Sequence, residues 1–405
     1  MPTMSRTLLI ACVAVSACGR INSTNMDAGV DGSTASDVAD PEQAAPPDTA
    51  PAVDAPASDT GAPDDTGPVT DSGGTDPSRG PPAGNPMGMC AVPAEAAVMN
   101  VSTPRTVVGT GTPASCTSDA FVAAVARGGV ITFNCGPSPV TITLTQTAKI
   151  VNNTGPEIVI DGGGRVTLSG GNRHRILYQN TCDRAQMWTT AMCQNQDHPR
   201  LTVQNLTFID GNATGETMDG GGGGAIFVRG GRFKIINSRF FHNVCDPSGS
   251  DVGGGAVRVL SQYNTLPVYV VHSTFGGASG LGNSGANGGG LSSIGVSYTV
   301  INSLFTDNSA TGRGASAGMG GNGGAIYNDG NTYTLTVCGS FIHDNRCNEG
   351  GSAIFYVSNN RTGNLVIRDS TLMNNPRGTF ETAGFPGIFY LGSGPIQVTN
   401  SMILR

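Results

Sequence analysis

The residues best suited to chemistry are acids and imidazoles at a recurring place in the chain. Asp210, His242, Asp307 and His343 each stand two positions after a phenylalanine, and Gly277 holds the same place between them. If these phenylalanines stack on one another, Asp210 lies beside His242. Asp307 then lies beside His343, with a gap at Gly277. A carboxylate beside an imidazole can act as a general acid–base pair, but solvated turns carry such residues without catalysing anything. Both interpretations of these catalytic candidates stay open.

A second candidate is the segment Thr181 to Arg200, which carries the only tryptophan of the chain, Trp188, between Cys182 and Cys193. Exposed tryptophans commonly anchor sugars or proteins. The alternative is that Trp188 folds back over an apolar patch. The first alternative predicts that Trp188 contributes to a binding site.

The cysteines predict disulfides rather than a metal site. Of the ten cysteines, Cys12 and Cys18 lie near the N-terminus, which leaves eight. An even number favours disulfides in an exported protein, and no C-x-x-C or paired-His spacing suggests zinc. The sequence-local pairs are predicted: Cys116–Cys135, Cys182–Cys193 and Cys338–Cys347. The pairing of Cys90 and Cys245 stays open, and we expect neither a metal nor a cofactor.

An internal repeat must position these residues. One landmark recurs every 30 to 36 residues. It comprises Val203–Phe208, Ile236–Phe240, Val271–Phe275, Ile301–Phe305, Val337–Phe341, Ile367–Leu372 and Val398–Ile403. A glycine landmark lies between successive copies: Gly223–Ile226, Gly254–Val257, Gly289–Leu291, Gly323–Ile326, Gly351–Ile354 and Pro386–Ile388. Two landmarks that keep the same phase indicate a repeat architecture.

Each repeat has the pattern of short strands separated by turns, with alternating apolar residues and no helical period. This pattern excludes a helical solenoid. A β-propeller needs four strands per blade and longer units. Three short strands in a unit of this length predict an all-β solenoid, the parallel β-helix, in which equivalent residues stack about 4.8 Å apart.

Stacking predicts two columns of side chains. The aromatic anchors should form one interior column: Phe208, Phe240, Phe275, Phe305 and Phe341. Asparagines that follow the anchors should form a ladder at a turn: Asn212, Asn243, Asn308, Asn345 and Asn375. Their amides would bond from coil to coil.

The elements Phe240–Asn243 and Phe305–Asn308, together with the Gly-Gly-Ala-Ile landmark, resemble the repeat of polymorphic outer-membrane proteins. These belong to the pectin-lyase-like group of right-handed parallel β-helices. The resemblance runs from about Ile158 to the C-terminus and implies that fold. The group includes adhesins, autotransporter passengers, lyases and hydrolases, so the fold does not determine the function. The Gly-His-Gly and Arg-Ile-Lys elements of its polygalacturonases are absent.

The region before the repeats predicts a cap. Ile158–Gly170 resembles the entry coils of such domains. Ser118–Gly128 predicts a short helix with a serine cap and a glycine stop. This helix would cover the open N-terminal end, where an uncovered sheet edge favours aggregation.

The first residues predict export. Arg6 precedes the apolar run Leu8–Val15, which is too short to span a membrane. Val15–Cys18 resembles a bacterial lipobox, which implies a lipoprotein signal peptide at 1–17 and lipid attachment at Cys18. A plain secretory signal is the alternative. Gly19 is not the aspartate that retains many lipoproteins at the inner membrane, so the resemblance favours the outer membrane or cell surface.

Residues 18–89 predict a disordered tether rich in Pro, Ala, Asp and Thr. Residues 19–89 hold 12 acidic and 2 basic residues, a net charge of −10, whereas residues 90–405 hold 17 acidic and 19 basic residues, a net charge of +2. The tether has too few apolar residues to offset the entropy of ordering. The acidity therefore belongs to the tether and indicates no nucleic-acid binding.

The sequence as a whole predicts a membrane-tethered, exported β-helix at 90–405 that presents a binding or adhesive surface. The expected ligand is a glycan or a cell-surface protein, and we expect a monomer. One alternative is a polysaccharide lyase or glycoside hydrolase that acts on extracellular polysaccharide. A second alternative is a structural spacer of the envelope.

Overall fold

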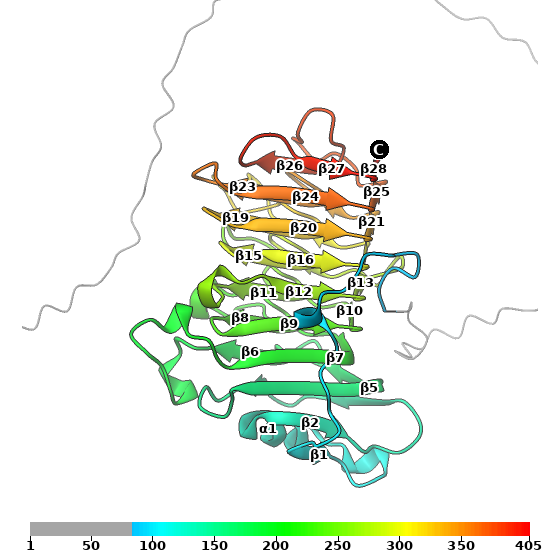
Figure 1. The fold of residues 1–405 in the computed structure, drawn as a ribbon, viewed down its shortest axis with the longest axis vertical. Helices are drawn as coiled ribbons and strands as arrows, with labels where there is room; N and C mark the ends of the chain where they lie inside the picture. The colour runs from blue at the N-terminus through cyan, green and yellow to red at the C-terminus, as the bar shows by residue number, and fades with distance from the viewer. Residues whose placement is uncertain (1–82) are drawn as a thin grey trace, which may run out of the picture. The chain divides into compact units, whose positions relative to one another are not determined.

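The computed structural model describes residues 83–405, in which short parallel strands stack coil upon coil (Figure 1). This confirms the predicted parallel β-helix. The signal peptide, Cys18 and residues 18–82 of the expected tether lie outside the described residues. No helix within 83–405 is long and apolar enough to cross a membrane.

Each repeating coil contributes one strand to sheet B and two to sheet A, and all the ladders between them are parallel. Sheet B comprises β4 (Ala148–Lys149), β6 (Leu177–Asn180), β8 (Ile226–Arg229), β11 (Val257–Leu260), β15 (Leu291–Ile294), β19 (Ile326–Gly330), β23 (Ile354–Ser358) and β26 (Ile388–Leu391). Sheet A comprises β1 (Thr106–Val108), β2 (Gly129–Phe133), β3 (Val140–Thr143), β5 (Glu157–Ser169), β7 (Arg200–Ile209), β9 (Arg232–Ile236), β10 (Arg239–Phe241), β12 (Val268–Val271), β13 (Thr274–Gly276), β16 (Tyr298–Ile301), β17 (Leu304–Thr306), β20 (Thr334–Cys338), β21 (Phe341–His343), β24 (Asn364–Arg368), β25 (Thr371–Met373), β27 (Gln397–Thr399) and β28 (Met402–Ile403). A short sheet C comprises β14 (Ser284–Gly285), β18 (Ser309–Ala310) and β22 (Arg346–Cys347).

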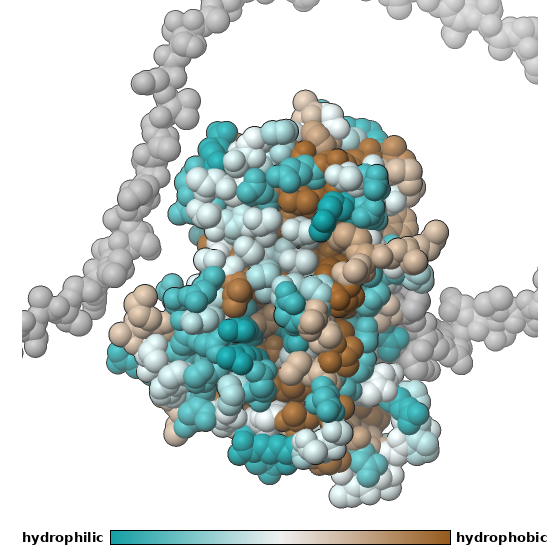
Figure 2. Space-filling model, viewed as in Figure 1, coloured by the Kyte–Doolittle hydropathy of each residue, from teal (hydrophilic) through white to brown (hydrophobic). Residues whose placement is uncertain are grey.

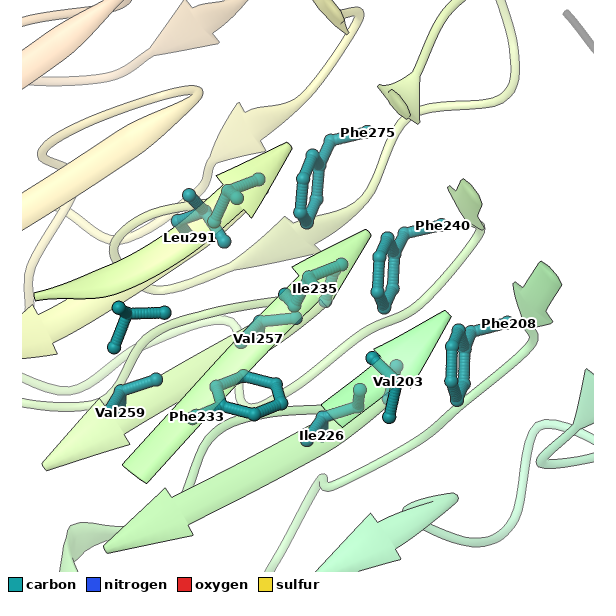
Figure 3. Close-up of a cluster of buried hydrophobic side chains, with 14 of the residues drawn as sticks. Val203, Phe208, Ile226, Phe233, Ile235, Phe240, Val257, Val259, Phe275 and Leu291 are labelled. Atoms are coloured by element: carbon teal, nitrogen blue, oxygen red, sulfur yellow. The ribbon is translucent and has the colours of Figure 1, made fainter. Parts of the chain in front are cut away.

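The core is a stack of phenylalanines between the sheets (Figure 3). Neighbouring ring centroids lie 4.9 Å apart for Phe208 and Phe240 and 4.6 Å apart for Phe240 and Phe275. The rings of Phe275 and Phe305 follow at 4.7 Å. All four side chains are fully buried and share one apolar cluster with Val203 and Ile235 of sheet A and Ile226 and Val257 of sheet B. The repeat therefore places one large apolar side chain at the same interior position of each of these coils.

The prediction that Phe341 is the fifth member of the aromatic column is wrong by one residue. Phe305 pairs with Ile342, and Leu304 pairs with Phe341. The serine before each anchor sets this register, because the Ser303 amide donates to Ser340 Oγ at 3.0 Å. Since side chains alternate along a strand, Phe341 points outward and Ile342 occupies the core.

The asparagine ladder is largely confirmed. Side-chain amides bond from Asn243 through Asn283, Asn308 and Asn345 to Asn375, each Nδ2–Oδ1 distance being 2.9 or 3.0 Å. Asn283 was not predicted, because a glycine-rich insertion separates it from Phe275. Asn212 lies outside the ladder, and the Gly211 amide instead donates to Asn243 Oδ1.

A helix covers the N-terminal end, as expected. Helix α1 (Ser118–Arg127) buries Phe121, Ala124 and Val125 against the first coils (Figure 1). Its N-cap is Thr117 rather than Ser118, since Thr117 Oγ1 accepts from the Ala120 amide at 3.2 Å. Short 3₁₀ turns complete the described helices: η2 (Ala94–Ala96), η3 (Pro113–Ser115), η4 (Arg184–Gln186), η5 (Cys193–Asn195), η6 (Met218–Gly220) and η7 (Tyr263–Thr265).

Two predicted disulfides, Cys116–Cys135 and Cys182–Cys193, are present. The predicted pair Cys338–Cys347 is wrong, because Cys338 is bonded to Cys90. Cys338 ends β20 on the outer side of sheet A, whereas Cys347 follows β21 into sheet C. The turn between these sheets separates the two residues despite their closeness in sequence. Cys245 and Cys347 are free thiols.

Residues 83–101, which we call the strap, run outside sheet A from the coil of β20 toward the N-terminal end (Figure 1). They cover a column of outward residues that stack in register at the ends of sheet A strands. The column comprises Gln204, Ile236, Val271, Ile301 and Cys338. Ile236, Val271 and Ile301 form a small apolar cluster with Ala96 of the strap. The strap therefore explains why apolar residues occupy this outer position in the repeat.

Candidate functional site

The first predicted acid–imidazole pair lies together. His242 Nδ1 is 3.6 Å from Asp210 Oδ1, and Asp210 raises the pKa of His242. His242 Nε2 contacts the Gly280 carbonyl oxygen at 2.6 Å. Both ring nitrogens are therefore engaged within the protein.

The second predicted pair is wrong by the same one-residue shift that moves Phe341. His343 pairs with Thr306 rather than with Asp307, and its Nε2 lies 2.7 Å from Thr306 Oγ1. Its Nδ1 lies 2.6 Å from Oδ2 of the adjacent Asp344. Asp307 instead accepts from the Gly280 amide at 2.7 Å.

The gap expected at Gly277 is occupied. The Gly280 carbonyl faces His242 and the Gly280 amide faces Asp307, so the loop after Gly277 bridges the two coils. The four catalytic candidates therefore do not form two acid–imidazole pairs on either side of a gap.

Trp188 is half-buried and stacks on His198 of the same insertion, with ring centroids 4.9 Å apart. The insertion itself borders the groove described next.

A groove of about 440 Å³ lies on the outer face of sheet A. Two columns on β5, β7, β9 and β12 form its floor. One column joins Glu157, Arg200 and Arg232 in register. The other joins Thr202, Lys234 and Tyr269. Parallel stacking thus brings residues far apart in sequence to within one coil spacing of each other.

The walls of this groove come from two separate segments. Glu95 and Met99 of the strap form one wall. Gln262, Leu266 and Pro267, around the η7 turn before β12, form the other. In the view of Figure 2, hydrophobic and hydrophilic residues alternate across the face that the strap crosses.

The charged groups of the groove are paired with one another. Arg200 donates to Glu157 Oε1 at 2.9 Å and also to Asp197. Arg232 Nη2 lies 2.5 Å from Asp197 Oδ1. Burial opposes ionisation of Asp197, but hydrogen bonds from Arg200 outweigh it and lower the pKa of Asp197. The guanidinium groups therefore reach the groove with their charge already compensated.

Lys234 is used by the strap. Its Nζ donates to the carbonyl oxygens of Glu95 at 3.1 Å and Ala97 at 3.3 Å, and it lies 3.1 Å from Met99 Sδ. Burial lowers the pKa of Lys234. Tyr269 Oη donates to Glu95 Oε1 at 3.3 Å. The amine thus holds the wall of the groove in place.

A second, more open cavity of about 600 Å³ shares Gln262 with the groove and extends it toward sheet B. Its lining is amides, hydroxyls and small residues: Gln194, Asn195, Ser261, Asn264, Thr265, Gly295, Val296 and Ser297. The Cys182–Cys193 insertion closes one side, since the Asn264 amide donates to Asn195 Oδ1 at 2.6 Å. We call the two cavities together the ligand groove.

Sequence reasoning did not identify Arg200, Arg232, Lys234 or Tyr269 as site residues. The signal that could have found them is alternation along the strand. Counting back by twos from the outward residue Ile236 gives Lys234 and Arg232 on the same face. The strap, which makes this face a groove, has no such signal.

The one cluster of potential metal ligands among residues 83–405 consists of Cys90, Cys338 and Asp369. The two cysteines are bonded to each other. They therefore offer no thiolate to a metal.

No protein family, curated protein sequence or solved structure shows significant similarity to this chain.

Proposed function

We propose that the protein is an exported, membrane-tethered binding protein that holds an extracellular glycan in the ligand groove. The observation that carries this proposal is the groove itself, a lined opening across several coils between the strap and the Cys182–Cys193 insertion.

The lining favours a hydroxyl-bearing, uncharged ligand. The second cavity of the groove is lined by side-chain amides and hydroxyls such as Gln262 and Thr265, which can both donate hydrogen bonds to sugar hydroxyls and accept them. In the first cavity, Arg200 is already paired with Glu157, and Arg232 is paired with Asp197. An acidic ligand would have to displace these carboxylates, so a neutral glycan fits better than a polyuronate. A cell-surface protein ligand is the alternative within the same class.

Export is supported by three disulfides, which suit an extracellular protein. The lipobox resemblance at Val15–Cys18 supports lipid anchoring at the outer membrane or cell surface. The Phe-x-x-Asn and Gly-Gly-Ala-Ile motifs support a place in the pectin-lyase-like group, with polymorphic outer-membrane-type repeats. The acidic segment before residue 83 would act as the tether.

The enzyme alternative receives less support. Both nitrogens of His242 and of His343 have partners within the protein, and Gly280 bonds to both His242 and Asp307 between the two coils. General acid–base catalysis needs a group that reaches the substrate. We therefore expect no turnover.

The test is a glycan array beside an activity screen on the purified protein. Saturable binding of a neutral glycan without cleavage is the expected result. The activity screen uses uronate-containing and neutral polysaccharides, with the His242→Ala, Asp307→Ala double variant as control. Cleavage by the wild type that is lost in this variant would replace the binding proposal with an enzyme.

A further inference from the structure

The strap is fastened to the solenoid at several points. Near its start, the Cys90 amide donates to Asn302 Oδ1 and Asn302 Nδ2 donates to the Cys90 carbonyl, both at 2.9 Å. Near its end, the Met99 amide and carbonyl make the same reciprocal pair with the Gln204 side chain, at 2.9 and 3.0 Å. Between them lie the buried Ala96 and the Lys234 ammonium. The Cys90–Cys338 disulfide is the one covalent fastening of the strap within residues 83–405.

The same strap is a wall of the ligand groove. Glu95 and Met99 line the part of the groove on the outer face of sheet A. Lys234 and Tyr269 of its floor donate hydrogen bonds to strap atoms. The position of the strap therefore sets the width of the groove and the orientation of the Lys234 ammonium.

Between Cys90 and Met99, the strap contacts the solenoid through the buried Ala96, the half-buried Val92 and the hydrogen bonds of Lys234 and Tyr269. Its one described 3₁₀ turn, η2, is three residues long, and Glu95, Ala97 and Val98 are exposed. A short segment with exposed backbone and one small buried side chain opens locally at low free energy. The covalent bond at Cys90 limits such opening by holding one end of the segment.

We propose that the Cys90–Cys338 disulfide is a latch that keeps the strap in place and thereby keeps the ligand groove formed. This inference rests on the proposed ligand groove. A dithiol reductant would open the latch. Its thiolate attacks one sulfur, which breaks the protein S–S bond and forms a mixed disulfide. Its second thiol then attacks the reductant's sulfur of that mixed disulfide and displaces the protein cysteine as a thiolate. The two electrons and two protons of the dithiol end on Cys90 and Cys338, and the reductant becomes a cyclic disulfide.

The Asp369 carboxylate lies 3.8 Å from Cys90 Sγ and 4.0 Å from Cys338 Sγ. A negative charge at this distance repels an approaching thiolate. Asp369 therefore slows thiol–disulfide exchange at the Cys90–Cys338 bond, which keeps the strap attached.

Release of the strap would uncover the apolar cluster of Ile236, Val271 and Ile301, which are at most 3 % exposed in the closed state. It would also free the Lys234 ammonium from the strap carbonyls. Opening thus has two signatures, new apolar surface and a distorted groove, and the first of these does not depend on any ligand.

The test compares the Cys90→Ser, Cys338→Ser double variant with wild type by hydrogen–deuterium exchange, binding of a hydrophobic dye, and affinity for the glycan selected on the array. The matched control is Cys116→Ser, Cys135→Ser, which removes a disulfide at the capped end. We expect exchange in residues 91–100 to rise by about tenfold or more in the double variant, with increased dye binding and weaker glycan binding. None of these three changes is expected in the control.

Unchanged exchange and dye binding in a folded double variant would overturn the latch. If that variant does not fold, Ala96→Asp keeps the disulfide but removes the buried contact. The strap around it should then exchange faster while the Cys90 amide, which donates to Asn302 Oδ1, stays protected. Faster exchange of the Cys90 amide as well would overturn the latch. Faster strap exchange with no glycan bound by wild type would support the latch and reject the glycan groove.

Discussion

Phe305 and Ile342 occupy the same interior place on successive coils, since they pair in register and both are fully buried. The aromatic stack that begins at Phe208 ends at Phe305, and Ile342 and Leu372 continue the column as aliphatic side chains. The neighbouring Phe341 faces outward and stacks on His343, with ring centroids 4.0 Å apart. The two phenylalanines, each a landmark of its repeat, therefore make a matched pair for testing the register.

Phe305→Ala should lower the free energy of unfolding by about 3–5 kcal/mol, because neighbouring coils cannot close the void. Phe341→Ala, the control, should cost well under half of that. Denaturant unfolding of both variants measures the difference. Equal losses, or a loss below about 1 kcal/mol at Phe305, would mean that the register is wrong.

The fold could be predicted because every repeat carries the same pattern of alternating apolar residues and turns. Alternation and spacing suffice to predict coils, and the Phe208-to-Phe305 column follows from them. Phe341 was misplaced because an aromatic at either of two adjacent positions satisfies the same spacing. The Ser303–Ser340 hydrogen bond, a contact between coils, decides between them. Local pattern thus predicts the architecture, but contacts between coils determine the register.

The pairing of His242 with Asp210 should make the stability of the protein depend on pH. Asp210 raises the pKa of His242 above its ordinary value near 6.5. The group then contributes stability that is fully present below the unfolded-state pKa and is lost as pH rises through the folded-state pKa. His242→Gln should therefore destabilise the protein at about pH 5 and much less at about pH 8.5.

Asp210→Asn is the control for the His242 measurement, because it removes the carboxylate but keeps the imidazole. Urea unfolding at the two pH values should show the same pH trend in both variants. A His242→Gln penalty that grows with pH would contradict the pairing.

The buried Cys245 and the half-buried Cys347 are the two free thiols among the eight cysteines of 90–405. Burial raises the pKa of both thiols to about 12. A maleimide reagent, which reacts with the thiolate, should label neither in the native protein and both after unfolding without reductant. Labelling of Cys90 or Cys338 in the unfolded, unreduced protein would contradict the observed pairing.

Cys18 predicts the anchor of the protein. If it carries the lipid, Cys18→Ser should release a soluble protein from the membrane fraction, and labelled palmitate should enter the wild type but not the variant. Absence of label from the wild type would reject lipidation and favour the plain secretory signal.

The ligand groove could not be predicted from the sequence, for a physical reason. Its floor follows from strand alternation at Arg232 and Lys234. Its wall, however, is a segment that precedes Lys234 by more than a hundred residues and bonds to it through backbone carbonyls. Every residue type has a backbone carbonyl, so the side chains of the strap give no sign in the sequence that Lys234 binds there. The Cys90–Cys338 bond escaped prediction for a similar reason, since its partners are 248 residues apart.

Binding of a glycan in the ligand groove can be tested by hydrogen–deuterium exchange of the protein with and without the neutral glycan that binds best on the array. A glycan in this groove should slow exchange in residues 199–204, 230–236 and 261–269, with no change around His242 and His343. Protection confined to the turns that carry His242, Asp307 and His343, with the groove unaffected, would contradict it.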